Sequence, residues 1–192
     1  MARVNSSLDT ALADAVERHE CPHLAVLLRT PDELLPLLAA FYRLGNLRNG
    51  WLVHRAPPLE HAAHRQALET AGLPVAELEA ERRMVIAPLD PFAPAEPVAQ
   101  TWSRELDAAL ARGHDAGWYA RSATGPDATE YQAILAHEAA WEACFHSRPV
   151  VTLCPFIVGP LEPDERVLRA DEVAETHDAL LVPDGRGGFR ER

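Results

Sequence analysis

The sequence contains no lysine, because all 18 of its basic residues are arginine. ATPases of the P-loop type use a lysine to hold the β- and γ-phosphates, and enzymes that form a Schiff base use a lysine amine as the nucleophile. The composition therefore excludes both kinds of chemistry in their usual form.

Cysteine is also scarce, and long apolar runs are missing. The three cysteines, Cys21, Cys144 and Cys154, form no Cys-x-x-Cys pair, so we expect buried thiols in a reducing compartment. Apolar runs such as "LLPLLAAF" are too short to span a bilayer, and the N-terminal segment has no apolar signal core. We expect a cytoplasmic protein without membrane contact.

An excess of basic charge is absent as well. The formal net charge is −11 at pH 7, and no run of arginines interrupts the acidic surface. Because such a surface repels a phosphate backbone, we expect no direct contact with nucleic acid. With 192 residues, of which 47% are hydrophobic, the chain can bury the core of a single domain.

The chain does contain a regular alternation of apolar runs and amphipathic segments. We expect strands at "HLAVLL", "GWLVHR", "RMVIAPL", "GWYARSA", "PVVTLCPF" and "ALLVPDG". Helices are expected over residues 8–18, 31–47, 58–72, 98–112 and 129–145, with shorter helical pieces over 75–81 and 162–178. This order predicts an α/β fold, a three-layer α/β/α sandwich around a mostly parallel sheet.

Local signals mark some of the boundaries. Thr30, Pro31 and Glu33 have the pattern of an N-cap, a first helical residue and a capping-box acid. Gly72 is suited to end the preceding helix. The segment "DPFAPAEP" holds three prolines, so we expect an irregular loop that forms the wall or lid of a pocket.

Parallel strands place ligands at the carboxyl edge of their sheet. Arg29, Arg55 and Arg121 each follow an apolar strand, where a guanidinium group can clamp an anionic or polar ligand. Ion pairs with the abundant surface acids are the alternative. The residues expected at this edge are Arg29, His54, Arg55, Pro88, Asp90, Arg121, Ser122, Cys154 and Phe156.

Two histidine-rich stretches have the composition of metal sites. In "HECPH", His19, Cys21 and His23 alternate, yet ligands so close together do not easily surround one ion. In "HAAH", His61 and His64 lie one helical turn apart, a spacing that exposed histidines also reach by chance. We expect no metal, although the residues alone leave these histidines open.

No nucleophile with its base and orienting group is evident. The chain has no Gly-x-Ser-x-Gly motif, and "HEAAWEACFH" has Trp141 where the zincin motif requires its second histidine. Cys154 ends a predicted strand, where it is either a reactive or redox-active thiol or a buried structural one. We expect no catalysis and no cofactor.

The order of the segments resembles a known family. "HLAVLLRTPDELLPLLAAFYRLGNLRNGWLVHRAPP", "ALETAGLPVAELEAERRMVIAPL" and "YQAILAHEAAWEACFHSRPVVTLCPF" are similar to the MEDS sensory domain of methanogen and methylotroph regulators. His23, Glu138 and Cys154 match residues found in that family, whereas Pro155 and Phe156 replace a polar pair.

That family is similar in fold to the RecA/KaiC ATPases, so the resemblance implies a RecA/KaiC-like sheet. The segment Arg29–Glu33 stands where a Walker A loop would lie, but it has neither glycine nor lysine. The strand "WYARSA" offers no Walker B aspartate. The resemblance therefore implies a pseudo-ATPase scaffold that does not hydrolyse ATP.

The resemblance also implies a sensory domain over residues 22–184, with an N-terminal helical extension over 1–21 and a C-terminal tail over 185–192. Such a domain binds a small organic ligand and signals through a regulatory partner protein. The ligand-binding residues that we expect are His23, Tyr42, Trp51, His54, Arg55, Arg121, Glu138, Cys154 and Phe156.

Two other functions remain open at this point. The first is a nucleotide-binding protein without hydrolysis, in which arginines and helix N-termini replace the lysine. The second is a ligand-free protein-interaction module, such as an anti-sigma or kinase partner, recognisable by an exposed apolar patch. A homodimer is plausible by analogy alone.

Overall fold

The computed structural model describes residues 6–19, 22–183 and 189–192, and these confirm the predicted alternation of strands and helices. The strands are β1 (His23–Leu28), β2 (Trp51–Ala56), β3 (Met84–Pro88), β4 (Gly117–Arg121), β5 (Val150–Ile157), β6 (Ala179–Pro183) and β7 (Phe189–Glu191). The α-helices are α1 (Ser6–Arg18), α2 (Leu34–Leu47), α3 (His61–Thr70), α4 (Val75–Ala80), α5 (Ala95–Ala111), α6 (Ala128–Phe145) and α7 (Pro163–Ala174).

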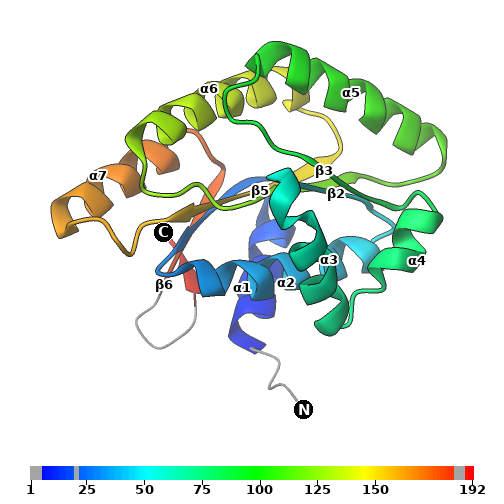
Figure 1. Ribbon diagram of the computed structural model, residues 1–192, viewed down its shortest axis with the longest axis horizontal. Coiled ribbons are helices and arrows are strands. Elements are labelled where there is room, and N and C mark those ends of the chain that lie inside the picture. Colours follow the sequence, from blue (N-terminus) through cyan, green and yellow to red (C-terminus); the bar gives the residue numbers. More distant parts are fainter. Residues whose placement is uncertain (1–5, 20–21, 184–188) are drawn as a thin grey trace.

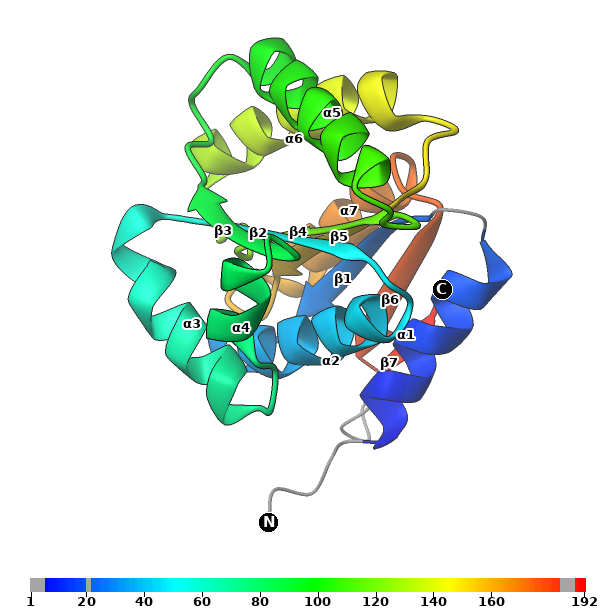
Figure 2. The same cartoon turned by 90° about the vertical axis from the view of Figure 1, so that its right-hand side faces the viewer.

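The strands form one twisted sheet in the order β3-β2-β4-β5-β1-β6-β7. All neighbours are parallel except β7, which pairs antiparallel with β6. Helices α5, α6 and α7 cover one face and α1 to α4 cover the other (Figure 1, Figure 2). The predicted three-layer α/β/α sandwich with a mostly parallel sheet is confirmed, while its likeness to RecA and KaiC stays a prediction.

Every residue of β1, β2 and β4 is buried, as expected for parallel strands covered on both faces. Successive side chains alternate between the faces. The face under α1 to α4 is filled by leucines and by large aromatic side chains such as Phe41 and Trp118. That face also buries His54 and His64, whereas the face under α5 to α7 receives the charged side chains that form the site described below.

Several boundaries differ from the prediction. Thr30 stands at the N-cap and Pro31 begins the helical turn, as predicted, but the Thr30 side chain makes no capping hydrogen bond. The Glu33 carboxylate accepts hydrogen bonds from Arg29 N at 2.6 Å and Nε at 2.8 Å, so the capping-box prediction is wrong. Helix α5 begins at Ala95 rather than at residue 98, since prolines are tolerated in a first helical turn. Gly72 ends the preceding helix with φ +89°, as predicted.

The predicted C-terminal tail contributes an edge strand that the sequence analysis did not anticipate. Three of its residues, Phe189–Glu191, pair with β6, and α1 packs beside them (Figure 2). The division of the chain at residues 21 and 184 stays a prediction, because these positions lie outside the described ranges. Within those ranges, no helix combines the length and the apolar character that crossing a membrane requires.

A buried polar cluster between the sheet and helix α6

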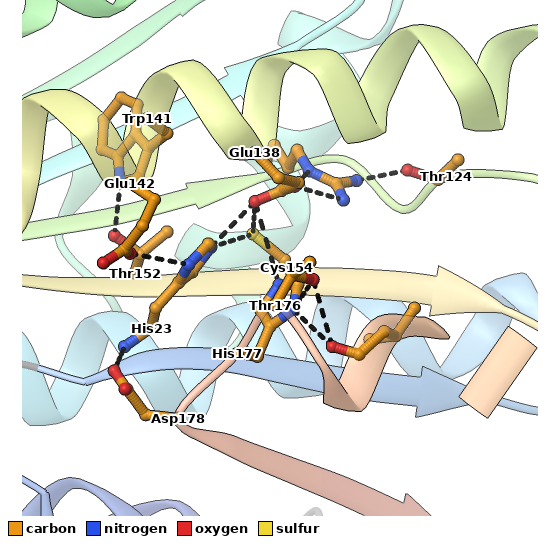
Figure 3. A network of polar contacts seen from close by, with 12 residues as sticks. His23, Thr124, Glu138, Trp141, Glu142, Thr152, Cys154, Thr176, His177 and Asp178 are labelled. Atoms are coloured by element: carbon orange, nitrogen blue, oxygen red, sulfur yellow. Dashed lines mark hydrogen bonds and ion pairs between the residues drawn. The ribbon is translucent and has the colours of Figure 1, made fainter. Parts of the chain in front are cut away.

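Five ionisable side chains meet beneath α6 (Figure 3). His23 is the first residue of β1, Arg121 is the last of β4, Cys154 lies in β5, Glu138 projects from α6 and His177 precedes β6. The exposed fraction is 5% for His23, 4% for Arg121, 2% for Cys154 and 5% for Glu138. Buried ionisable groups are costly, so their concentration in one place marks a candidate functional site.

The two oxygens of the Glu138 carboxylate have separate partners. Oε1 accepts hydrogen bonds from Arg121 Nε at 3.1 Å and Nη2 at 2.9 Å. Oε2 accepts from His23 Nε2 at 2.8 Å and from Cys154 Sγ at 3.2 Å. Arg121 also donates to Thr124 Oγ1, so its guanidinium is held from two sides.

These contacts set the charges of the cluster. Burial raises the pKa of Glu138, but Arg121 and then His23 outweigh burial and hold that pKa well below its usual range. Burial lowers the pKa of His23, but its contacts with Cys154 and Glu138 outweigh burial and raise that pKa well above 6.5. Burial, and after it Glu138, raises the pKa of the Cys154 thiol. The cluster therefore contains a carboxylate between two cations, beside a neutral thiol.

His177 completes the cluster, and its outer nitrogen has no hydrogen-bond partner. Nδ1 lies 2.8 Å from the carbonyl oxygen of Val173, so it carries the proton and donates it to that oxygen. Nε2 is buried, makes no hydrogen bond and lies 3.8 Å from Glu138 Oε2. Burial, and after it His23, lowers the pKa of His177 to about 4, so the ring is neutral near pH 7. Sequence reasoning missed His177, because a single histidine in a polar helical segment carries no motif.

A second buried cation lies beside the cluster. Arg55 is 5% exposed and donates from Nε to the carbonyl oxygen of Pro88 and from Nη1 to Tyr119 Oη, both at 3.1 Å. Among the described residues, no carboxylate pairs with this guanidinium, and none of their hydrogen bonds uses Nη2. Arg55 and Tyr119 line a cavity of about 20 Å³ under α5 and α6 that also borders Arg121, Glu138 and Cys154.

Comparison with known proteins identifies the family. Residues 22–178 match the family model described as "MEDS: MEthanogen/methylotroph, DcmR Sensory domain". The chain belongs to the MEDS family. The resemblance inferred from the segments is therefore confirmed, and a MEDS domain is a sensory domain.

None of the curated proteins matches this chain. Among solved structures, its fold is similar to that of the uncharacterized protein PH0321 from Pyrococcus horikoshii, which was solved in complex with an unknown peptide. The TM-score is 0.61 at 11% sequence identity, over 96% of this chain and 88% of that chain. At this identity the likeness concerns the fold alone.

The other residues expected to bind a ligand fall into two groups. Phe156 and Trp51 lie on the α5–α7 face of this MEDS domain, where the Phe156 ring centroid is 4.8 Å from the Arg121 guanidinium and Trp51 packs near Trp102. Tyr42 and His54 lie on the opposite face, linked to each other at 3.1 Å. The structure thus gathers His23, Arg121, Glu138 and Cys154, sets Arg55 beside them and separates Tyr42 and His54 from them.

The carboxyl edge of the sheet holds a different and larger pocket of about 980 Å³. Of the residues expected at this edge, Pro88, Asp90 and Ser122 line it, whereas none of the nine expected ligand-binding residues does. Arg29 forms an exposed ion pair with Glu33 at 2.7 Å, which is the surface alternative considered for the arginines.

The other histidines considered as possible metal ligands have different contacts. His19 faces Glu191 at 3.2 Å, while Cys21 lies outside the described residues, so "HECPH" forms no common site among the residues described. His61 Nε2 lies 2.9 Å from the carbonyl oxygen of Ala56, and His64 Nδ1 lies 2.8 Å from His54 Nε2. Only His23 of these four histidines joins the buried cluster.

Proposed function

We propose that this MEDS domain is a non-catalytic cytoplasmic sensor of a small organic ligand that carries a carboxylate or carbonyl oxygen. The ligand binds at Arg55, in the cavity between the sheet and helices α5 and α6. The observation that carries the proposal is the buried Arg55 guanidinium, for which the described residues supply no carboxylate.

A buried cation without a counterion is expensive, since partners must replace the water that it has lost. The carbonyl of Pro88 and the hydroxyl of Tyr119 replace part of that water. The remaining donor, Nη2, is available to a ligand oxygen, and guanidinium groups bind carboxylates in planar, charge-assisted pairs. A ligand anion would therefore supply the charge that Arg55 lacks.

The cavity must enlarge to admit such a ligand, because about 20 Å³ accommodates little more than a water molecule. Helix α5 is the element best suited to move. It forms one wall of the cavity through Ala95, Val98 and Ala99. Only three of its 17 residues are fully buried, while Trp102 and Leu110 are half-buried against the core. The preceding loop is held to α6 by His137, whose Nε2 lies 3.1 Å from the carbonyl oxygen of Ala93.

Movement of α5 and its loop changes the surface that a partner protein contacts. Phe92 in this loop is 66% exposed and is therefore already presented to solvent. The ligand would bind the open arrangement more tightly than the closed one and would therefore shift the population toward the open arrangement. A regulatory partner would then bind the surface that this movement exposes. Catalysis is not part of the proposal: Cys154 and Glu138 both line the cavity, but burial and then Glu138 raise the pKa of the thiol, so it stays protonated.

The charges at the carboxyl edge of the sheet argue against the alternative function, nucleotide binding. Glu60, Asp90, Asp127 and Glu130 line the large pocket there, and no arginine is among the residues that line it. Such a surface repels phosphates. Among the described residues, no observation as specific as the Arg55 environment supports the other alternative, a ligand-free protein-interaction module.

A thermal-shift screen tests the proposal. Short carboxylates, from formate to butyrate, are compared with alcohols and amides of equal chain length, in the presence of EDTA. We expect stabilisation by carboxylates, reaching about 2.7 kcal/mol at a ligand concentration of a hundred times Kd. The variant Arg55→Gln should lose the effect, while the exposed control Arg29→Gln should keep it. Equal shifts in Arg55→Gln and in the unmodified protein would contradict the proposal.

A further inference from the structure

We propose that His23, Glu138, Cys154 and His177 form a binding site for one transition-metal ion, with zinc as the ion that fits best. This site shares Glu138 and Cys154 with the wall of the Arg55 cavity, but the observations that carry it do not include Arg55. Each residue offers one ligand atom, and the four atoms all lie within 4.8 Å of one another. Figure 3 shows these side chains converging from α6, β1, β5 and the segment before β6.

The distances between the ligand atoms approach those of a zinc tetrahedron. Zinc bonds to nitrogen, oxygen and sulfur place neighbouring ligand atoms about 3.3–3.6 Å apart. Cys154 Sγ lies 3.4 Å from His23 Nε2 and 3.2 Å from Glu138 Oε2. Glu138 Oε2 lies 2.8 Å from His23 Nε2 and 3.8 Å from His177 Nε2. All pairs of ligand atoms lie within 4.8 Å, so shifts of up to about one ångström, mainly of His177, would complete the tetrahedron.

The orientation of His177 is a second and independent observation. Its side chain is 0% exposed and its Nε2 has no hydrogen-bond partner, so a buried lone pair is directed into the cluster. Its Nδ1–H donates to the carbonyl oxygen of Val173. Metal-bound histidines have this arrangement, in which the outer N–H is fixed by a carbonyl or carboxylate and the other nitrogen binds the ion.

The neighbours of the other ligands fit the same pattern. Arg121 occupies only Oε1 of Glu138, so the partners of Oε2 are two of the other proposed ligands, His23 and Cys154. His23 Nδ1 has no hydrogen-bond partner either, and it lies 3.6 Å from Glu142 Oε2, which would accept its proton once Nε2 binds the metal. These contacts would orient both ligands.

The hydrogen bonds of the cluster already converge on one point. Without an ion, Glu138 Oε2 accepts hydrogen bonds from both His23 Nε2 and Cys154 Sγ. An ion bound at Oε2 would take the place of these two hydrogens, because metal ligands bind in their deprotonated form.

Access and ligand chemistry narrow the choice of ion. A pocket of about 400 Å³ reaches His23 from the surface, and its wall contains Glu142 and Asp178 together with Arg148. Thiolate and imidazole ligands favour zinc and related transition metals over magnesium and calcium, which prefer oxygen. A divalent transition metal is therefore the expected occupant.

Cobalt is the probe for the test. Full-length protein without a histidine tag is stripped with EDTA and titrated with Co²⁺, while elemental analysis of unstripped protein measures zinc. We expect one equivalent of Co²⁺ per chain, the visible bands of tetrahedral cobalt and a thiolate charge-transfer band. Cys154→Ser should lose the charge-transfer band, whereas Cys144→Ser, a half-buried cysteine outside the cluster, should keep it.

Histidine variants provide a second comparison that does not depend on the folding of Cys154→Ser. His177→Gln should weaken Zn²⁺ binding by about tenfold or more, since loss of even an outer partner of a ligand costs about 10–100-fold. His114→Gln, outside the cluster and with its Nδ1 3.3 Å from the carbonyl oxygen of Asn49, should leave it unchanged.

Absence of saturable Co²⁺ binding, or a charge-transfer band that persists in Cys154→Ser, would overturn the metal proposal. Arg55→Gln should retain the cobalt spectrum. A failure of the carboxylate screen with an intact cobalt spectrum would therefore refute only the proposed function, and the reverse result would refute only the metal site.

Discussion

Removing the charge of Glu138 is predicted to be the most damaging conservative change in the α5–α7 layer. Glu138→Gln keeps the size of the side chain but leaves Arg121 buried without a carboxylate, and it also removes the anion that His23 contacts. The side chains of Glu138 and Arg121 are each 5% exposed, so water cannot take the place of the lost charge.

The magnitude follows from the burial of both partners. Breaking a buried ion pair by removing one partner costs about 3–5 kcal/mol, because it leaves an uncompensated charge in the interior. Glu138→Gln should therefore lower the free energy of unfolding by about 3–5 kcal/mol at pH 7. The matched control is Glu142→Gln one turn further along α6, where the side chain is 50% exposed, and it should change stability by less than about 0.5 kcal/mol.

Urea denaturation followed by circular dichroism, in EDTA so that no metal contributes, measures both variants. The double variant Glu138→Gln with Arg121→Met should recover part of the loss, since it removes both charges rather than one. A loss below about 1 kcal/mol in Glu138→Gln, or equal losses in both single variants, would refute the reasoning.

Two further predictions concern stability. His54 is buried and its pKa is lowered to about 3, by burial first and then by His64, whereas the unfolded chain binds that proton near 6.5. The unfolded state therefore holds more protons between these values, and the unfolding free energy should fall with decreasing pH by up to about 1.4 kcal/mol per unit. His54→Leu should flatten this slope in urea titrations, and an unchanged slope would contradict the assignment. Gly159→Ala would place its Cβ 1.7 Å from the carbonyl oxygen of Arg29, so we expect a loss of about 1–3 kcal/mol. Gly125→Ala meets only a contact at 3.8 Å and should stay near neutral, and equal melting temperatures would refute the clash.

The fold was predictable because apolar runs alternate with amphipathic segments along most of the chain. Strand β7 was not, since Phe189–Glu191 is short and has no apolar alternation, and its pairing depends on the neighbouring β6. The capping-box prediction was wrong because Glu33 contacts Arg29 instead of the N-terminus of the helix. Residue spacing does not show which of these two partners the carboxylate will bind.

The site was predictable only in part. Resemblance to the family indicated His23, Glu138 and Cys154, and the end of a predicted strand indicated Arg121. His54 and Arg55 were both expected to line one ligand site. Neighbouring residues in a strand point to opposite faces of the sheet, so these two side chains cannot lie in the same site.

His177 could not be predicted, because its approach to the cluster depends on tertiary structure. The connection between α7 and β6 turns beside β1, where Asp178 accepts a hydrogen bond from the backbone nitrogen of His23 at 2.8 Å. The same turn places the His177 ring 4.1 Å from the ring of His23. No sequence spacing reports a contact between residues so far apart along the chain.

The proposed role of Arg55 as the residue that binds the ligand can be measured by isothermal titration calorimetry. The titrant is the carboxylate that stabilises the protein most, in EDTA, and the unmodified protein is compared with Arg55→Gln. We expect saturable binding of one ligand per chain that weakens by at least tenfold in Arg55→Gln and is unchanged in Arg29→Gln. Equal affinity in Arg55→Gln and in the unmodified protein would contradict this role.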